Sequence, residues 1–413
     1  MAAARIDGSG IDRSEIDRSE IDGSSLKIIH VLRAPLGGLF RHVLDLTREQ
    51  IARGHRVGMI TDSLAGGDRA AQILAELEPQ LALGLMRLPI RRNPHPGDIV
   101  NLMKISGRCN ALQPDVIHGH GSKGGLFARL TGFLPGSGHA IRVYTPHGGS
   151  FNYRPGTPLH KLYMFAEGIL ERKTDVFLFE SDFIRSCFVR YVGETRKLTR
   201  IVLNGISDAE FEPVEAAADA ADFVYVGELR SAKGIDTFID AIAELKRRTG
   251  TEYRALLVGT GPDQEALTAQ AAALGVAGQI SFPGGMPARD AFRRGRIMIV
   301  PSRAESLPYV VLEAAGGRVP MIATDVGGIP EIYGPCAHRL IACNDKMALA
   351  NAIEDMLAKS ADDRRREAEE LGAFVEATFH ISDMTDAVID GYRAALGLPA
   401  AVQPAPARTP VAA

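Results

Sequence analysis

Residues 296–317 read RIMIVPSRAESLPYVVLEAAGG and contain one complete succession of strand, loop and helix. The apolar run RIMIVPS predicts a buried strand, and Pro308 suits the first turn of a short helix that two glycines end. Glu305 lies on the loop, and Glu313 lies inside the helix. The stretch therefore predicts one strand-to-helix unit of a parallel sheet, with a carboxylate just beyond the carboxyl end of the strand.

Short apolar runs alternate with amphipathic segments along most of the chain. The first series starts with LKIIHVL (26–32), followed by a Gly-rich turn and a helix over about residues 38–53. A second series starts with FVYVGEL, after an acidic and alanine-rich break. This alternation predicts an α/β fold with parallel sheets covered by helices on both faces. The predicted segments are a disordered repeat tail (1–25), a first α/β domain (26–206), a linker (207–222), a second α/β domain (223–380), a C-terminal helix (381–397) and a disordered tail (398–413).

The composition is typical of a soluble globular protein. Of 413 residues, 46% are hydrophobic and 23% charged, and the net charge of −3 argues against a nucleic-acid partner. Four scattered cysteines without a CxxC pair argue against a disulfide framework and against structural zinc. No run reaches the roughly 18 apolar residues of a membrane span, and the N-terminus lacks the core of a signal peptide, so we expect a cytoplasmic protein. Residues 85–96 (LMRLPIRRNPHP) mix arginine with apolar residues, which fits either a peripheral contact with the inner face of the plasma membrane or a plain basic surface loop.

The loops after the strands of the first domain hold glycines and histidines. Gly37 and Gly38 precede a helix, where backbone amides attract phosphate, although a structural turn explains them equally well. His118 and His120 fit either metal ligands or polar residues at a strand end. His147 stands between a proline and two glycines on a tight loop, which suits a residue that faces a ligand.

The loops of the second domain hold cations and carboxylates. Arg230 and Lys233 precede a helix, where basic residues make sense if an anion such as a diphosphate is bound; solvated surface charges are the alternative. Glu305 and Glu313 are eight residues apart, or about 12 Å at helical rise, whereas the carboxylates of a glycosidase lie about 5–9.5 Å apart. The two acids are therefore predicted to contact different parts of one long ligand through its hydroxyl groups.

Five motifs together resemble the retaining glycosyltransferases of family 4, which have the GT-B fold: GELRSAKG, TPHGG, LNG, TDVGGIPE and Glu305-x7-Glu313. The resemblance covers about residues 26–397. It implies two Rossmann-like α/β/α domains that face each other across a cleft, with the C-terminal helix packing back on the first domain. It also implies transfer of a hexose from a UDP- or GDP-sugar, bound mainly by the second domain, to a glycan or lipid-linked oligosaccharide on the first. Synthesis of a surface polysaccharide or lipopolysaccharide is the setting that this analogy suggests.

The resemblance assigns a role to each residue that matches a family motif. His147 would lie beside the donor sugar at the reaction centre, Glu305 would bind hydroxyls of that sugar, and Glu313 would bind the ribose. Arg230 and Lys233 would hold the diphosphate. Further donor contacts are implied for the backbone near Gly37, Gly38, Ser306 and Leu307, and for Met286 beside the nucleobase.

Two features of the sequence qualify the resemblance. Glu228 stands where many members have arginine, with Arg230 two residues later, so the diphosphate role is more certain for Lys233. No D-x-D motif occurs, so we expect that no metal or other cofactor is required and that fixed cations and the helix dipole stabilise the leaving diphosphate. A nucleotide-sugar epimerase on the same fold and a catalytically inactive sugar-nucleotide-binding protein are the alternatives.

Overall fold

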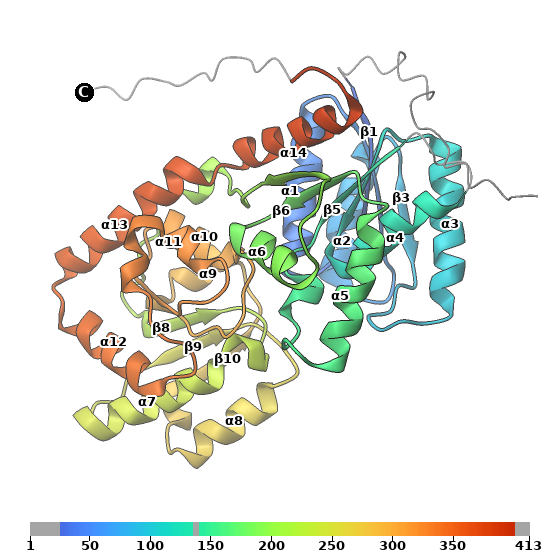
Figure 1. Cartoon of the computed structure of the whole chain (residues 1–413). Coiled ribbons are helices and arrows are strands. Elements are labelled where there is room, and N and C mark those ends of the chain that lie inside the picture. The colour runs from blue at the N-terminus through green and yellow to red at the C-terminus, as the bar shows by residue number, and fades with distance from the viewer. Residues whose placement is uncertain (1–24, 135–139, 401–413) are drawn as a thin grey trace, which may run out of the picture.

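Two parallel β-sheets, each with helices on both faces, form two domains that lie side by side (Figure 1). The computed structural model describes residues 25–134 and 140–400. The predicted repeat tail, apart from residue 25, and the C-terminal tail beyond residue 400 lie outside the described residues. The strand order is β3-β2-β1-β4-β5-β6-β7 in the first sheet and β10-β9-β8-β11-β12 in the second. The α/β class and the tandem arrangement predicted from the sequence are confirmed.

The elements of the first domain alternate as the sequence pattern predicts. Its strands are β1 (Lys27–Leu32), β2 (Arg56–Asp62), β3 (Leu85–Leu88), β4 (Val116–His120), β5 (Ile141–Thr145), β6 (Val176–Phe179) and β7 (Leu198–Ile201). Its helices are α1 (Gly37–Ala52), α2 (Gly67–Leu77), α3 (Gly97–Leu112), α4 (Gly121–Leu130), α5 (Pro158–Glu171) and α6 (Asp182–Tyr191).

The second domain repeats the plan with a five-stranded sheet. Its strands are β8 (Ala221–Val226), β9 (Ala255–Val258), β10 (Ile280–Gly284), β11 (Gly295–Val300) and β12 (Met321–Ala323). Its helices are α7 (Ile235–Thr249), α8 (Gln264–Ala273), α9 (Ala288–Phe292), α10 (Tyr309–Gly316), α11 (Ile329–Tyr333), α12 (Lys346–Ala358) and α13 (Ala361–Thr378), and the last helix of the chain is α14 (Ile381–Leu396). The strand-to-helix unit of residues 296–317 is thus β11 followed by α10, with Pro308 at the N-cap.

Successive residues of the central strands pack into opposite cores, as the two-residue period of a strand requires. On β1, Ile28 belongs to a core with α14, whereas Ile29 belongs to a core with α3 and α4. On β8, Phe223 packs with α7, and Val224 packs with α10 and α13. Both sheets are therefore covered on both faces, which explains why strands such as β1 and β8 carry buried apolar residues on both sides.

Helix α14 returns from the second domain and packs on the first. Met384, Val388, Tyr392 and Leu396 are buried at helical spacing against the first sheet. The Tyr392 hydroxyl lies 2.6 Å from Nδ1 of His118 on β4. The C-terminal helix is thus an integral part of the first domain's core, as predicted.

Residues 85–96 do not form an exposed apolar surface. Leu88 and Ile90 are 4% and 0% exposed and belong to the first domain's core, whereas Arg87, Arg91 and Arg92 are exposed. No helix among residues 25–134 and 140–400 is long and apolar enough to cross a membrane.

Candidate active site

Lys233 and Glu305, which are 72 positions apart, meet at the carboxyl end of the second sheet. Lys233 Nζ donates to Glu305 Oε1 at 2.7 Å, and Ser302 Oγ donates to the same oxygen at 2.6 Å. The Lys233 and Glu305 side chains are 17% and 8% exposed. The pair lies where the ligands of open α/β sheets bind, so the structure brings together two of the predicted site residues.

Two glycines allow close backbone contacts at the loops that carry Lys233 and Glu305. Gly234 has φ +66°, and an added Cβ would lie 1.9 Å from the Pro301 carbonyl oxygen. Gly327 has φ +62°, and its Cβ would lie 1.9 Å from the carbonyl oxygen of Glu305 itself. The motif TDVGGIPE therefore supports the Glu305 loop from behind, which is a physical reason for its two glycines.

Arg230 points away from the Lys233–Glu305 pair. Its Nε lies 2.8 Å from Glu228 Oε2, and both side chains are exposed. Arg230 also lines a separate cavity of about 210 Å³ between the turn that precedes α7 and helix α8. Its diphosphate role stays a prediction, and it requires the guanidinium to leave Glu228.

Glu313 is paired with a cation from the other domain. Arg41 on α1 binds both Glu313 on α10 and Glu210 in the segment between the sheets. Burial raises the pKa of Glu313, and Arg41 opposes that rise. The Arg41 guanidinium also lies 4.7 Å from the centre of the Tyr309 ring. The ribose role predicted for Glu313 therefore requires its carboxylate to accept hydrogen bonds from both Arg41 and the ribose hydroxyl groups.

The start of α1 and the loop before α10 lie against each other across the cleft. A Cβ on Gly38 would lie 3.5 Å from the Tyr309 ring, whereas Gly37, with φ +63°, has nothing within 4 Å of such an atom. Leu307 is buried, and its carbonyl oxygen accepts from Asn204 Nδ2 at 2.7 Å. The predicted backbone contacts at Gly37, Gly38, Ser306 and Leu307 therefore come from one region of the cleft, while partly buried Met286 packs at the edge of the second domain's core.

His147 is held on a strained loop after β5. Its φ of +49° is unusual for a residue with a side chain. The next amide, of Gly148, donates to the buried Glu180 carboxylate at 2.6 Å, and burial raises the pKa of Glu180 to about 7. Ser150 Oγ lies 2.9 Å from Glu167 Oε1, and Glu167 is itself paired with the buried Arg129. This support fixes where the His147 ring points.

His147 belongs to a histidine cluster with four other rings: His42 on α1 and His120 on β4 contact it, and His30 on β1 and His118 on β4 pack against His120. Strands β1 and β4 pair with His30 opposite His118, and His120 two residues on points to the same face. Burial lowers the pKa of all five rings, to about 4 for His30 and His42 and well below the usual value for His118, His120 and His147. The rings are therefore neutral at pH 7.

One ring of the histidine cluster, that of His42, contacts the second domain. His42 and His147 have ring centroids 4.6 Å apart, and His42 Nδ1 lies 3.1 Å from the Tyr309 hydroxyl on α10. His147 is thus one imidazole away from the helix that follows the Glu305 loop. His42 and Gly38 of the first domain thus meet Tyr309 of the second domain.

Sequence reasoning missed several residues that build the cleft. Glu331 on α11 accepts from the amides of Asp182 and Phe183 at 2.9 Å each, and so joins the second domain to the start of α6. Arg41 and His42 follow the predicted glycine turn directly, in GGLFRH, so their place at the start of α1 was the available signal. Glu331 is the last residue of the motif TDVGGIPE, so the motif marked its position but not its contact with α6, whereas no local pattern distinguishes Glu180 from a surface acid.

Family models match both domains in order. A model of group 1 glycosyl transferases matches residues 207–372, and a model of glycosyltransferase family 4 matches residues 36–210. The chain belongs to the group 1, family 4 glycosyltransferases. This confirms the resemblance inferred from the motifs, and the two models meet at the segment between the two sheets.

Relatives of this glycosyltransferase chain include two proteins of Bacillus subtilis (strain 168). One is TuaC, named as a teichuronic acid biosynthesis glycosyltransferase, which is 38% identical over 130 residues; this match covers 32% of the chain and only 31% of TuaC. The other is EpsD, named as a glycosyltransferase, which is 29% identical over 293 residues, or 66% of the chain and 75% of EpsD.

Solved structures share the two-domain fold of this family. Sucrose-phosphate synthase from Thermosynechococcus elongatus has a TM-score of 0.75 at 20% identity and covers 90% of this chain and 99% of its own. HepE from Anabaena, in complex with UDP and glucose, has a TM-score of 0.71 at 17% identity and covers 88% and 98%. The GT-B architecture expected from the resemblance is confirmed.

Proposed function

We propose that the protein is a retaining glycosyltransferase that moves a hexose from a nucleotide-diphosphate sugar to a glycan acceptor. The observation on which this proposal rests is the Lys233–Glu305 pair, which is largely shielded from solvent at the carboxyl end of the second sheet. The cation suits a diphosphate and the carboxylate suits sugar hydroxyl groups. UDP is the first nucleotide to test, because HepE, which has the same fold, was solved with UDP and glucose.

The chemistry places growing negative charge on the diphosphate as the anomeric bond breaks. Lys233 is a cation that can stabilise this charge, and backbone amides at the start of α10 would add to it. Glu305 and the loop of His147 would orient the sugar. In a retaining transfer the leaving phosphate can accept the acceptor's proton, so we assign no protein base. We propose that this set of residues works without a metal on the diphosphate.

Product analysis tests the function. With a sugar nucleotide and a glycan acceptor, we expect a glycosylated product with unchanged anomeric configuration, and no conversion of the donor when the acceptor is left out. A donor epimer formed without acceptor would support an epimerase, and binding without turnover would support an inactive binding protein. Activity lost in EDTA and restored by Mg²⁺ would contradict the metal-free diphosphate.

Lys233→Ala tests the site within that assay. We expect transfer to fall at least about a hundredfold, the usual cost of removing a preorganised charge stabiliser. Lys246→Ala is the matched control, because Lys246 donates to Glu252 at 2.8 Å in an exposed pair of the same domain. Near-normal transfer by folded Lys233→Ala would show that the diphosphate is held elsewhere.

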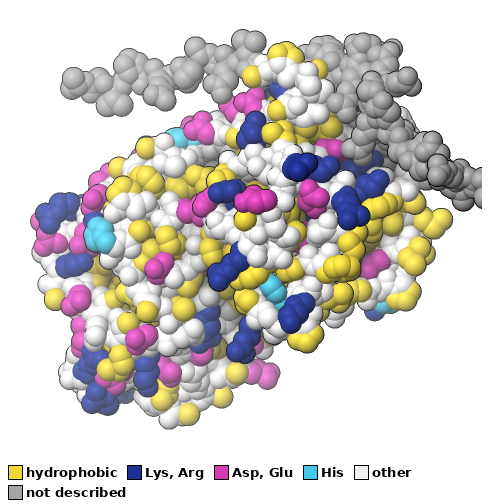
Figure 2. Space-filling model, in the orientation of Figure 1, with side chains coloured by type: hydrophobic (Ala, Val, Ile, Leu, Met, Phe, Trp, Pro, Cys, Tyr) yellow, Lys and Arg dark blue, Asp and Glu magenta, His cyan; other side chains and the backbone are white. Residues whose placement is uncertain are grey.

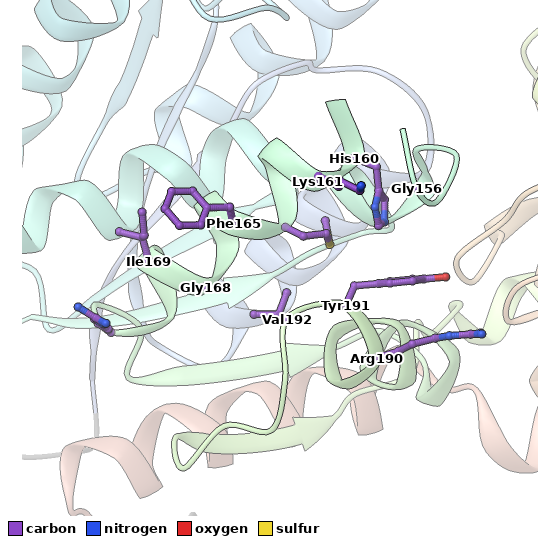
Figure 3. Close-up of a pocket in the computed structure, with 11 residues that line it drawn as sticks. Gly156, His160, Lys161, Phe165, Gly168, Ile169, Arg190, Tyr191 and Val192 are labelled. Atoms are coloured by element: carbon purple, nitrogen blue, oxygen red, sulfur yellow. The ribbon is translucent and has the colours of Figure 1, made fainter. Parts of the chain in front are cut away.

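We also propose that the first domain contacts the inner face of the cytoplasmic membrane and takes a lipid-linked acceptor. Four apolar residues of α5 are exposed: Leu159, Leu162, Phe165 and Ile169. Phe165 and Ile169 line an open groove of about 570 Å³ against Tyr191 and Val192, with Lys161, Arg172 and Arg190 also in its lining (Figure 3). Hydrophobic and basic side chains lie among acidic ones on the face of the molecule that Figure 2 shows. Such a surface suits lipid tails beside anionic head groups.

Vesicle sedimentation tests this contact. We expect the protein to sediment with vesicles that contain phosphatidylglycerol, and the Leu162→Ser, Phe165→Ser double variant to stay in solution. Leu274→Ser is the control, because Leu274 is an exposed leucine of the second domain. Equal sedimentation of the double variant and the wild type would remove α5 from the proposal. The name of TuaC supports a role in surface-polymer synthesis, which is proposed on that likeness alone.

A further inference from the structure

The histidine cluster contains a buried ring nitrogen without a partner. His42 is 2% exposed, and its Nε2 has no hydrogen-bond partner among the residues that the structure describes. Its other nitrogen, Nδ1, lies 3.1 Å from Asn204 Oδ1. Because Asn204 Nδ2 donates to the Leu307 carbonyl, the amide oxygen faces the ring, so Nδ1 carries the hydrogen. His42 Nε2 is therefore a bare lone pair enclosed in protein, and such groups are costly unless something binds them.

A second ring nitrogen without a hydrogen follows from the hydrogen-bond chain through His30. His30 Nε2 lies 2.8 Å from Gln50 Oε1 and donates to it, which leaves His30 Nδ1 as an acceptor. His120 Nε2 lies 2.9 Å from that atom and must donate to it. His120 Nδ1 then carries no hydrogen and accepts from His147 Nε2, which lies 3.1 Å away.

The three rings meet at one place. His42, His120 and His147 each offer a ring nitrogen within 4.8 Å of the other two. Three nitrogens bound tetrahedrally to Zn²⁺ at about 2.0–2.1 Å lie about 3.4 Å apart, so shifts of about an ångström suffice. Metal-binding histidines typically hold their second nitrogen with an outer hydrogen bond, and His42 and His120 already do so through Asn204 and His30.

A neighbouring set of rings is a poorer site. His30, His118 and His120 also lie within 4.8 Å of one another through one nitrogen each. However, His118 Nδ1 lies 2.6 Å from the Tyr392 hydroxyl and His118 Nε2 lies 2.8 Å from Thr145 Oγ1. Binding a metal there would break one of these bonds, whereas His42 Nε2 has none to lose.

We propose that His42, His120 and His147 form a binding site for a divalent transition-metal ion, for which Zn²⁺ is the natural probe. Imidazole nitrogens suit Zn²⁺, Ni²⁺ and Cu²⁺ and do not suit Mg²⁺ or Ca²⁺. Three protein ligands leave a fourth position for water. On binding, His147 turns its Nε2 lone pair to the metal, and its remaining hydrogen moves to Nδ1.

The site has a consequence for activity that depends on the proposed function. His147 is the ring expected beside the donor sugar, so a metal that holds it removes it from that position. Stoichiometric Zn²⁺ should lower transfer, and EDTA should restore it. An enzyme that needs a metal on its diphosphate would respond in the opposite way: the metal would raise transfer, and EDTA would lower it. Metal binding itself does not depend on the transfer reaction.

Direct titration tests the site on the untagged, full-length protein, stripped with EDTA and exchanged into chelator-free buffer. We expect calorimetry to give one equivalent of Zn²⁺, and Co²⁺ to give the intense visible absorption of a tetrahedral site. His42→Gln and His147→Asn should each weaken Zn²⁺ binding at least about tenfold, and Asn tolerates the positive φ at 147. His160→Ala, a buried histidine of α5 outside the cluster, should bind as the wild type does.

Each alternative result overturns the assignment. No stoichiometric binding by the folded wild type would show that the cluster is only a neutral hydrogen-bonded network. Binding lost in His118→Gln but kept in His42→Gln would place the metal in the neighbouring set. Thermal melts of every variant establish that the fold is intact. If the protein has no transferase activity, the calorimetric and Co²⁺ results stand by themselves, so failure of the function and failure of the site are distinguishable.

Discussion

Replacing Glu305 with glutamine should change nucleotide binding and sugar transfer in opposite directions. Lys233 Nζ and Glu305 Oε1 are 2.7 Å apart, and both side chains are largely shielded from solvent. A diphosphate that binds Lys233 must compete with this carboxylate and also lie beside its negative charge. Glutamine keeps the volume and can keep the bond to Ser302, but it removes the charge.

The size of the effect follows from that distance. At an effective dielectric constant of about 20, the Coulomb attraction of the pair is about 6 kcal/mol, and desolvation of both ions offsets most of it. A net difference of about 1–2 kcal/mol corresponds to about tenfold in affinity. We therefore expect Glu305→Gln to bind UDP about tenfold more tightly while transfer from a UDP-sugar falls by a hundredfold or more.

Calorimetry with the nucleotide diphosphate, followed by a transfer assay with the matching sugar nucleotide, measures the two effects. A thermal-shift screen of UDP, GDP and ADP first selects the nucleotide, since only a ligand of the native state raises the melting temperature. Glu252→Gln is the control, because it releases Lys246 from an exposed pair of similar length. If folded Glu305→Gln binds the nucleotide no better than the wild type, the carboxylate does not compete for Lys233 and the reasoning is refuted.

Three further perturbations test the framework of the cleft. Gly327→Ala should lower the free energy of unfolding by about 3 kcal/mol or more and lower transfer, because its Cβ would lie 1.9 Å from a carbonyl oxygen. Gly250→Ala is the control: Gly250 has φ +70° and open space around it, so its replacement should cost about 1 kcal/mol. Equal losses for the two variants in urea melts would contradict this. Arg41→Ala should lower the free energy of unfolding by about 3 kcal/mol, because it leaves the carboxylates of Glu210 and Glu313 unpaired, and Arg41→Lys should lower it less. A loss below about 1 kcal/mol for Arg41→Ala in the same melts would show that these ion pairs are dispensable. The free energy of unfolding should fall as the pH drops from about 6.5 towards 4. The pKa of His42 is lowered to about 4 in the folded protein, so the unfolded chain binds more protons in this range. The loss of stability from this ring reaches about 3 kcal/mol. Glu180, with its pKa raised to about 7, stabilises the folded protein as the pH falls from about 7 to 4.5, but the five histidines with lowered pKa values outweigh it. A melting temperature that rises from pH 7 to pH 5 would contradict this reasoning.

The fold was predictable because its pattern is local. Apolar runs and amphipathic segments alternate with the periods of strand and helix, and the apolar strands indicated sheets covered on both faces. The positions of Lys233 and Glu305 followed as well, since both lie on loops at the carboxyl ends of strands. The arrangement of residues 296–317 was correct to within one or two residues.

Much of the rest depends on contacts between distant parts of the chain. Arg41 and Glu313 are 272 positions apart, and no local pattern indicates that the predicted ribose ligand pairs with the first domain. His118 and His120 were recognisable as strand-end histidines, but the sheet order that places β1 beside β4, and so adds His30, is a property of the folded chain. For residues 85–96 the sequence left a membrane contact and a plain basic surface loop open, and it gave no signal for the exposed apolar residues of α5, because the fold determines which apolar residues are buried.

Helix α14 has a consequence for how the chain folds during synthesis. The first domain's sheet is complete at Ile201, but part of its core consists of residues 384–396, which are synthesised after the second domain. Until then the surface that α14 covers, with the buried His118 behind it, is open to water. The first domain therefore cannot reach its final stability ahead of the second, and the last sixteen helical residues act as the closing step for the half of the protein that is made first.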